Sequence, residues 1–234
     1  MAIWVIWVIM IIFSYLFGSI PASYLAGKLR GIDLREHGTT QVGGGNLWRM
    51  TSWKFGLPVG MFDFAKGLGM VWIAQLQGLD VAQQLVVGLA AIVGHNWPIY
   101  LRFHGGRGGG TTLGIFSILP FINDMIPWPS VAFWAILIIG RLSLGSSPLP
   151  VLVCLIAAPL VSWGFHEPLP VTLGFLTIFL VIVIKRLSAQ SSVEAASISK
   201  SRLLFNRLLF DRDISDKKVW MYRKPIAKQE EWED

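Results

Sequence analysis

Long uncharged stretches of apolar residues alternate with short polar segments along most of this chain. No Asp, Glu, Lys or Arg occurs in residues 1–27, 81–101, 108–123, 125–140, 142–166 and 168–184. Several of these stretches match or approach the ~20 apolar residues that cross a hydrocarbon core of about 30 Å. The pattern predicts seven membrane helices, over residues 3–26, 55–78, 82–102, 110–125, 127–141, 146–163 and 168–185. We therefore expect an all-α fold, a polytopic membrane helix bundle.

The fourth and fifth predicted helices are short, and residues 110–141 could instead form one broken helix because three prolines interrupt them. The positive-inside rule separates the two interpretations. With seven spans, every Lys and Arg except Lys66 falls on one side of the membrane, whereas a merged helix would move Arg141 or the whole C-terminal segment to the other side. We therefore expect about seven transmembrane helices, with the N-terminus outside and the C-terminus in the cytoplasm.

The chain divides into two parts by composition. Residues 1–186 hold the seven predicted helices, and residues 187–234 form a basic tail that we expect in the cytoplasm. Within the tail, the unit Arg-Leu-Leu-Phe occurs twice between Arg202 and Phe210, which favours an interfacial helix with a basic and an apolar face. The first predicted helix is expected to be retained and not cleaved as a leader, because no basic residue precedes its apolar core.

Composition narrows the classes of function. The 234 residues are 53% hydrophobic and only 15% charged, with a mean hydropathy of +0.57, which excludes an intrinsically disordered chain. A single cysteine, Cys154, excludes a secreted disulfide scaffold. The net charge of +6 is explained by basic residues next to an anionic cytoplasmic leaflet, so we expect no nucleic-acid partner. No HExxH or paired-cysteine motif is present, and we expect neither a metal nor a cofactor.

Two glycine-rich segments lie in predicted cytoplasmic loops, each with an arginine. The first spans residues 38–46 and is followed by Arg49, and the second spans residues 105–112 around Arg107. Glycines let several backbone N–H groups point at one anion, and an arginine adds a planar charge that suits phosphate. The residues predicted to form a phosphate pocket are Gly38, Thr40, Gln41, Gly43, Gly44, Gly45, Asn46, Gly105, Gly106, Gly108, Gly109 and Thr111. The alternative is that the glycines only allow tight turns between membrane helices.

Three further ionisable residues lie within predicted helices. Asp63 and Lys66 are three positions apart and share a helix face, so that they can form an ion pair. Charged side chains at membrane depth are functional candidates, but a pair that only sets helix orientation explains them equally well. For His95 we favour helix packing over catalysis. No Gly-x-Ser-x-Gly or His-x4-Asp motif is present, so any catalysis would rest on positioning and charge stabilisation.

Several motifs together carry a resemblance to a known family. The chain has Gly-Ser-Ile-Pro at 18–21, Asp-x-x-Lys-Gly at 63–67, a Gly-His segment that ends in glycines and threonine at 94–111, and Ser-Leu-x-Ser at 143–146. With the segment 38–49, these follow the motif order of the bacterial acyl-phosphate:glycerol-3-phosphate acyltransferases, which the chain resembles. The resemblance implies a seven-helix membrane enzyme. It would transfer a fatty acyl group from acyl phosphate to the 1-hydroxyl of glycerol 3-phosphate, giving lysophosphatidic acid and phosphate.

The resemblance also implies roles for individual residues. The candidate catalytic residues are Thr39, Arg49 and Arg107, and the two arginines are expected to hold phosphate groups and offset developing charge. The side chains expected to orient hydroxyl or phosphate oxygens are Thr39, Asn46, Ser143 and Ser146. The proton of the attacking hydroxyl is expected to pass to the substrate's own phosphate, since no side-chain base is evident.

The implied setting is the bacterial inner (plasma) membrane, with a multi-pass chain whose active site faces the cytoplasm. The implied partners are acyl phosphate, glycerol 3-phosphate and membrane lipid. Contact with the enzyme that produces acyl phosphate is a further expectation.

Some motif positions depart from the family pattern. The family's serine is Thr39, its Gly-Asn pair is Thr40-Gln41, its lysine is Arg107, and no His-Arg-x-x-Asn ending is recognisable after the last helix. These departures favour, as an alternative, a non-catalytic homologue that binds acyl phosphate or phospholipid head groups. A transporter of a phosphorylated metabolite is another alternative, but it would require an internal repeat, and none is visible in the sequence.

Overall fold

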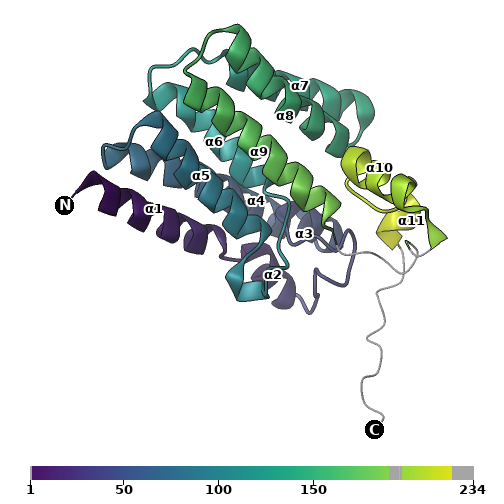
Figure 1. The fold of residues 1–234 in the computed structure, drawn as a ribbon. Coiled ribbons are helices and arrows are strands. Elements are labelled where there is room, and N and C mark those ends of the chain that lie inside the picture. Colours follow the sequence, from purple (N-terminus) through teal and green to yellow (C-terminus); the bar gives the residue numbers. More distant parts are fainter. Residues whose placement is uncertain (1, 190–194, 196, 223–234) are drawn as a thin grey trace.

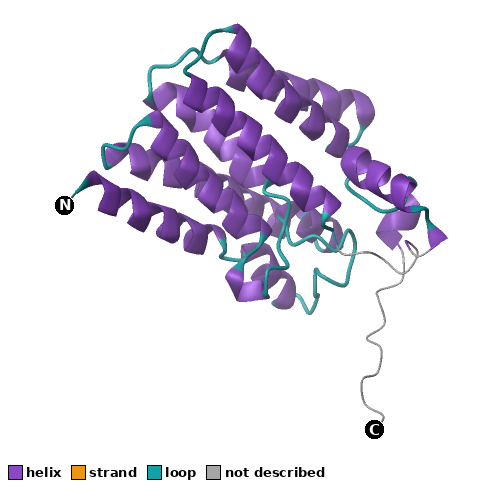
Figure 2. Ribbon diagram, viewed as in Figure 1, coloured by secondary structure: helices purple, strands orange, loops and turns teal. Residues whose placement is uncertain are grey.

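The computed structural model describes residues 2–189, 195 and 197–222, and all regular elements among them are helices (Figure 1, Figure 2). In chain order they are α1 (Ile3–Gly18), α2 (Ala22–Lys28), α3 (Gly44–Met50), α4 (Trp53–Leu76), α5 (Val81–Asn96), the 3₁₀ turn η1 (Ile99–Leu101), α6 (Gly109–Ile122), α7 (Trp128–Leu144), α8 (Pro148–Gly164), α9 (Leu169–Leu187), α10 (Lys200–Phe210) and α11 (Lys217–Tyr222). The predicted all-α class is confirmed.

The apolar pattern located the long helices well. Each predicted membrane segment overlaps one of α1–α2, α4, α5, α6, α7, α8 and α9. The predicted helix 82–102 is too long, because α5 ends at Asn96 and only the 3₁₀ turn η1 follows within that range. The region 110–141 forms two helices, α6 and α7, as the charge distribution required. Four segments are long and apolar enough to cross a membrane, namely Ile3–Lys28, Trp53–Leu76, Val81–Leu101 and Leu169–Leu187, while α6, α7 and α8 are shorter apolar helices. The number of spans and the sides of the termini stay predictions.

The first predicted helix, 3–26, is not continuous, which corrects the expectation from the sequence. It ends at Gly18 and resumes at Ala22 as α2, because Pro21 has no N–H to continue the hydrogen-bond pattern. The break frees the carbonyl oxygens of Gly18 and Ile20. The Nζ of Lys66 on α4 donates to both, at 3.2 and 2.6 Å, so neither of these two carbonyl oxygens is left without a donor.

Close helix contacts depend on glycine. Gly67 of α4 lies directly against the carbonyl oxygen of Thr111 on α6, and Gly114 of α6 lies against that of Phe64, so that a Cβ does not fit at either position. Elsewhere the core is filled by large apolar side chains. The ring of Phe116 stacks on those of Phe133 and Phe175, with centroids 4.3 and 4.5 Å apart.

The short helices α2, α3, α10 and α11 gather at one end of the bundle, where α9 ends (Figure 1). Helix α10 forms where the sequence predicted an interfacial helix, and it packs against α8 and α9. Parts of the predicted tail, residues 190–194, 196 and 223–234, lie outside the described residues. The end of the bundle that carries these short helices also carries both glycine-rich segments.

Replacement of Gly67 by alanine tests the tight contact between α4 and α6. Its Cβ would overlap the Thr111 carbonyl oxygen, so we expect Gly67→Ala to destabilise the protein by about 1–3 kcal/mol. The matched control is Gly69→Ala on the same helix, where no atom lies within 4 Å of the added Cβ. Thermal unfolding in detergent should show a Tm below that of the wild type for Gly67→Ala but not for Gly69→Ala. Equal Tm values for the two variants would contradict the tight contact.

Candidate active site

A polar cavity of about 360 Å³ opens at the end of the bundle where the short helices gather. Its walls come from the first glycine-rich segment and α3, from α4 and the end of α5, and from the second glycine-rich segment at the start of α6. The turn between α7 and α8, the end of α9 and the segment from Phe210 to Met221 complete it. Residues far apart in the sequence thus surround one space.

The first glycine-rich segment is held in shape by Asn46. Its Nδ2 donates to three backbone carbonyl oxygens, those of Leu34, His37 and Gln41, at 3.3, 3.0 and 3.1 Å. Its Oδ1 accepts from the backbone N of Thr39 at 3.0 Å. With its hydrogen bonds used in this way, Asn46 organises the loop around the cavity.

Two neighbouring residues of this loop, Gly38 and Thr39, have distinct roles. Gly38 has a φ of +62°, and a Cβ there would collide with Asn46 Oδ1, which explains glycine at this position. Thr39 follows it in the cavity wall, and its buried Oγ1 has no hydrogen-bond partner in the fold. A buried hydroxyl without a partner is unusual in a stable structure, so Thr39 is well placed to bind a ligand oxygen.

The second glycine-rich segment packs against the end of α5. The backbone N of Gly106 donates to the carbonyl oxygen of His95 at 3.1 Å, and a Cβ on Gly106 would collide with His95 Nε2. Gly108 caps α6 with a φ of +68°, and Gly109 and Gly110 line the cavity. The N-terminus of α6 therefore presents backbone N–H groups and partial positive charge to the cavity.

Arginines from five segments add positive charge to the cavity wall: Arg49, Arg107, Arg141, Arg186 and Arg212. Burial lowers the pKa of the Arg49 guanidinium, and the nearby charge of Arg141 lowers it further. Arg49 stays protonated at neutral pH because guanidinium is a very weak acid. Like charges this close repel one another, so the arrangement favours a bound anion.

The predicted Asp63–Lys66 ion pair is confirmed. Asp63 Oδ1 lies 3.0 Å from Lys66 Nζ and 3.4 Å from His95 Nδ1, and all three side chains are buried. Asp63 and His95 line the cavity. His95 thus lies in the cavity wall with a carboxylate against one ring nitrogen, which is the arrangement of a histidine held in one orientation.

The structure brings most predicted site residues together. Those that line the cavity are Thr39, Gln41, Gly43, Gly44, Gly45, Asn46, Arg49, Asp63, His95, Gly106, Arg107, Gly109 and Ser146. Those outside its wall are Gly38, Thr40, Lys66, Gly105, Gly108, Thr111 and Ser143. Ser143 is exposed on α7, and Ser147, which the sequence analysis did not single out, lines the cavity beside Ser146.

Other lining residues were missed by sequence reasoning. They include Arg141, Arg186 and the C-terminal Phe210, Asp211, Arg212, Lys217, Trp220 and Met221. Arg141 had a visible signal, because it is the only charge between two long apolar stretches. The C-terminal residues had none, since no local pattern says that they fold back onto the loops. Among the described residues no three His, Cys, Asp or Glu side chains gather to hold a metal ion.

An apolar groove of about 540 Å³ adjoins the polar cavity. It runs between α6, α7, α8 and α9, and its lining side chains include Leu113, Phe133, Leu137, Ile138, Leu142, Val151 and Leu155. The groove and the cavity share Arg107, Arg141 and the first glycines of α6. A molecule with an anionic head and an apolar chain therefore fits both at once.

Comparison with known proteins agrees with this geometry. A family model described as glycerol-3-phosphate acyltransferase matches residues 8–194. The chain belongs to the glycerol-3-phosphate acyltransferase family. One family member, glycerol-3-phosphate acyltransferase 4 of Dehalococcoides mccartyi (strain CBDB1), is 38% identical over 96% of this chain and 97% of its own length. Glycerol-3-phosphate acyltransferase 2 of Moorella thermoacetica is 38% identical over 71% of this chain and 83% of its own.

Two solved structures of the same acyltransferase family share the fold. The crystal structure of PlsY (YgiH), an integral membrane glycerol 3-phosphate acyltransferase, in its glycerol 3-phosphate form is 27% identical, with a TM-score of 0.71 over 89% of this chain and 94% of that one. The lysophosphatidic acid form is 26% identical, with a TM-score of 0.67 over 86% of this chain and 93% of that one. Together with its apolar helices, this likeness makes the chain an integral membrane protein of the acyltransferase family.

Two substitutions distinguish the role of Asn46, which supports the loop, from that of Thr39, which is placed to bind the ligand. Asn46→Asp would place carboxylate oxygens against three carbonyl oxygens, so we expect a loss of about 1–3 kcal/mol in stability together with a loss of activity. Thr39→Val removes a hydroxyl that has no partner in the fold, so we expect unchanged stability. Its activity should fall roughly tenfold or more, as for the loss of a polar contact to the transition state.

The measurements are thermal unfolding and turnover for both variants. An Asn46→Asp protein with wild-type Tm would show that Asn46 does not support the loop. A fully active Thr39→Val protein would remove Thr39 from the binding site.

Proposed function

We propose that this chain transfers a fatty acyl group from acyl phosphate to the 1-hydroxyl of glycerol 3-phosphate, giving lysophosphatidic acid and inorganic phosphate. The observation that carries the proposal is a cationic cavity that continues into an apolar groove, in a chain that belongs to the glycerol-3-phosphate acyltransferase family. The activity makes the chain an enzyme of phospholipid synthesis. The PlsY structures in the glycerol 3-phosphate and lysophosphatidic acid forms support the same class of substrate and product here.

The apolar groove and the cationic cavity hold the apolar and the charged parts of the substrates, respectively. The acyl chain lies in the groove between α6, α7, α8 and α9. Its removal from water there contributes a favourable free energy of about 25 cal/mol per Å² of buried apolar surface. The phosphate groups lie in the cavity. The reacting carbonyl is then placed at the shared wall, which contains Arg107, Arg141 and Gly109.

Catalysis follows from positioning and charge stabilisation. An acyl phosphate is already activated, so the 1-hydroxyl attacks its carbonyl directly and the phosphate leaves without a covalent enzyme intermediate. Arg49, Arg107 and the N-terminal N–H groups of α6 stabilise the negative charge on the carbonyl oxygen and the departing phosphate. Such fixed donors act strongly in a site with little water.

The proton of the attacking hydroxyl needs an acceptor. We assign it to His95, because Asp63 lies against its Nδ1 and the ring lies in the cavity wall. The proton moves from the hydroxyl to the imidazole as the new carbon–oxygen bond forms, and it leaves with the phosphate. The substrate's own phosphate is the competing acceptor.

His95→Gln distinguishes the two acceptors. The amide keeps hydrogen-bonding atoms but cannot accept the proton, so we expect kcat to fall by roughly 10²-fold or more. Phosphate release from purified protein in detergent measures it, with Tm as the check on folding. Turnover within a few fold of the wild type would assign the proton to the substrate phosphate.

The topology is part of the proposal. Seven spans with the N-terminus outside place the cavity, both glycine-rich segments and the basic residues at the cytoplasmic face of a bacterial plasma membrane. There the enzyme meets soluble glycerol 3-phosphate and a membrane-bound acyl phosphate. We also propose contact with the enzyme that supplies the acyl phosphate, because its product is amphiphilic and does not diffuse freely through water.

The direct test uses purified protein with palmitoyl phosphate, in the presence and absence of glycerol 3-phosphate. We expect phosphate release that depends on glycerol 3-phosphate and disappears in Arg107→Ala, because that variant loses a cation at the shared wall. Arg107→Lys keeps the charge and restores the family residue, and should retain activity. Acyl phosphate binding without release would instead identify a non-catalytic homologue.

A further inference from the structure

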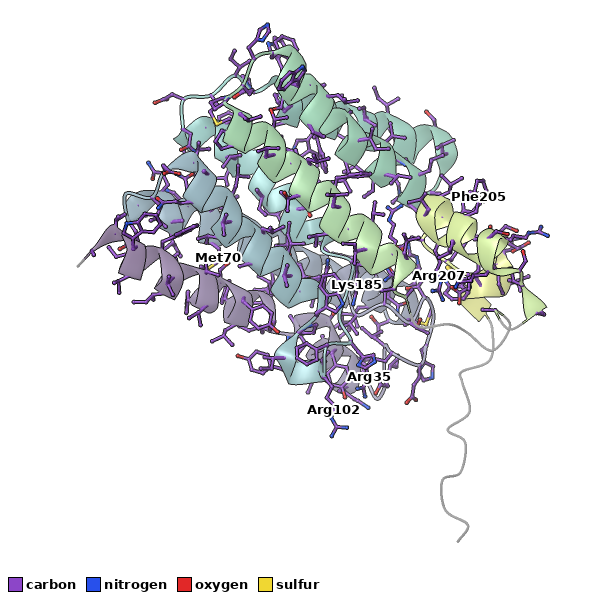
Figure 3. The ribbon with its side chains drawn as sticks, viewed as in Figure 1. Arg35, Met70, Arg102, Lys185, Phe205 and Arg207 are labelled. Carbon is purple, nitrogen blue, oxygen red and sulfur yellow. The ribbon has the colours of Figure 1, made fainter. Side chains whose placement is uncertain are left out.

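The turn after α10 lines the cavity and carries an acid to its cationic wall. Figure 3 labels Lys185 and Arg207, which mark the region where the end of α9 meets α10. Asp211 follows α10 directly, and its Oδ1 lies 2.7 Å from Nε of Arg107. Its Oδ2 accepts from Nε2 of Gln41 at 3.0 Å. One carboxylate therefore bridges the second glycine-rich segment to the first.

This carboxylate occupies the kind of position that the proposed function gives to a substrate phosphate. A carboxylate and a phosphate can each present two oxygen atoms to a guanidinium, and arginine binds both. Arg107 also donates through Nη1 to the carbonyl oxygen of Lys185 at 2.8 Å, which holds the guanidinium in place. A ligand phosphate at Arg107 and the carboxylate of Asp211 would compete for the same charge.

The contact between the two groups is close but poorly aligned. Nε of Arg107 and Oδ1 of Asp211 are both buried, and neither makes a hydrogen bond of good geometry although the two atoms lie 2.7 Å apart. The attraction is thus mainly that of two charges. A phosphate, with three terminal oxygens, can satisfy the guanidinium in the directions that this carboxylate does not.

The backbone around Asp211 is anchored without its side chain. Nε of Arg207 pairs with Asp213 at 2.7 Å, and Nδ2 of Asn206 donates to the carbonyl oxygen of Asp213 at 2.8 Å. Nη1 of Arg186 donates to the carbonyl oxygen of Leu208 at 2.8 Å. Asp211 can therefore leave Arg107 by rotation of its own side chain while α10 stays in place.

We propose that Asp211 is an internal competitor for the phosphate that binds at Arg107, and that it thereby sets the affinity of this enzyme for that substrate. The inference rests on the proposed function for the identity of the substrate. In the free enzyme, Asp211 neutralises Arg107 and bridges it to Gln41. Binding of a substrate phosphate displaces the carboxylate, so part of the binding energy is used to break this ion pair.

Asp211→Asn tests the competition with little change in shape. Asp211 has a φ of +53°, a conformation that asparagine tolerates as well as aspartate. Loss of the charge should lower the KM of whichever substrate places its phosphate at Arg107 by roughly threefold to tenfold, with the change confined to KM. Separate titrations of acyl phosphate and glycerol 3-phosphate identify that substrate. The Kd for inorganic phosphate should fall by a similar factor.

Asp216→Asn is the matched control. It removes the same charge from the same segment, but Oδ1 of Asp216 accepts from the backbone N of Lys218 and Val219, and an asparagine Oδ1 accepts from both in the same way. We expect KM and the phosphate Kd of this variant to equal those of the wild type. In an Arg107→Ala background, where no turnover is expected, Asp211→Asn should leave the Kd for inorganic phosphate unchanged, because the competition requires Arg107.

Unchanged or weaker phosphate binding by Asp211→Asn would overturn the proposal, and would make Asp211 a support for Arg107. An equal gain in Asp216→Asn would also overturn it, because the effect would then be one of net charge. Phosphate binding is measured without turnover, so the competition is tested even if no variant transfers acyl groups. Absence of turnover in all variants would instead contradict the proposed function.

Discussion

One buried ammonium connects the elements on which the site depends. Lys66 is 1% exposed, and its Nζ contacts two carbonyl oxygens freed by the break between α1 and α2 together with the carboxylate of Asp63. A buried charge without such partners would be strongly unfavourable. The break in the first helix, the rotation of α4 and the location of Asp63 beside His95 therefore depend on one another.

The cavity exists because helices approach one another closely at glycine. Gly67 and Gly114 bring α4 and α6 into backbone contact, which places the start of α6 beside Asp63. Gly106 lies against His95 in the same way. Larger residues at these positions would separate the backbone N–H groups of the second glycine-rich segment from the side chains of α4 and α5. The glycines thus serve packing and chemistry together.

Charge in the cavity is arranged for a ligand. Several arginines from separate elements line one space, and their mutual repulsion is relieved when an anion binds. Asp211 offsets part of this charge from within the chain. The adjoining apolar groove lacks charge except at the wall that it shares with the cavity. This division suits an amphiphile that is held by its head group and its chain at the same time.

Much of this protein was predictable from local patterns. The apolar stretches located the long helices, the glycine-rich segments located two walls of the cavity, and the spacing of Asp63 and Lys66 predicted their ion pair. Each of these signals lies within a short run of residues, where periodicity, charge and the conformational freedom of glycine act directly. The family motifs also lie within such runs.

Tertiary structure decided how these pieces meet. Asn46, expected to orient ligand oxygens, forms its hydrogen bonds with the backbone of its own loop. Lys66 donates to a carbonyl oxygen at the break between α1 and α2, more than 40 positions away in the chain. Asp211 reaches Arg107 and Gln41 although nothing around it in the sequence resembles a site. Such contacts depend on which distant carbonyls, carboxylates and guanidinium groups the packed helices bring within 3 Å or so. Packing alone sets those distances, and no local sequence pattern encodes them.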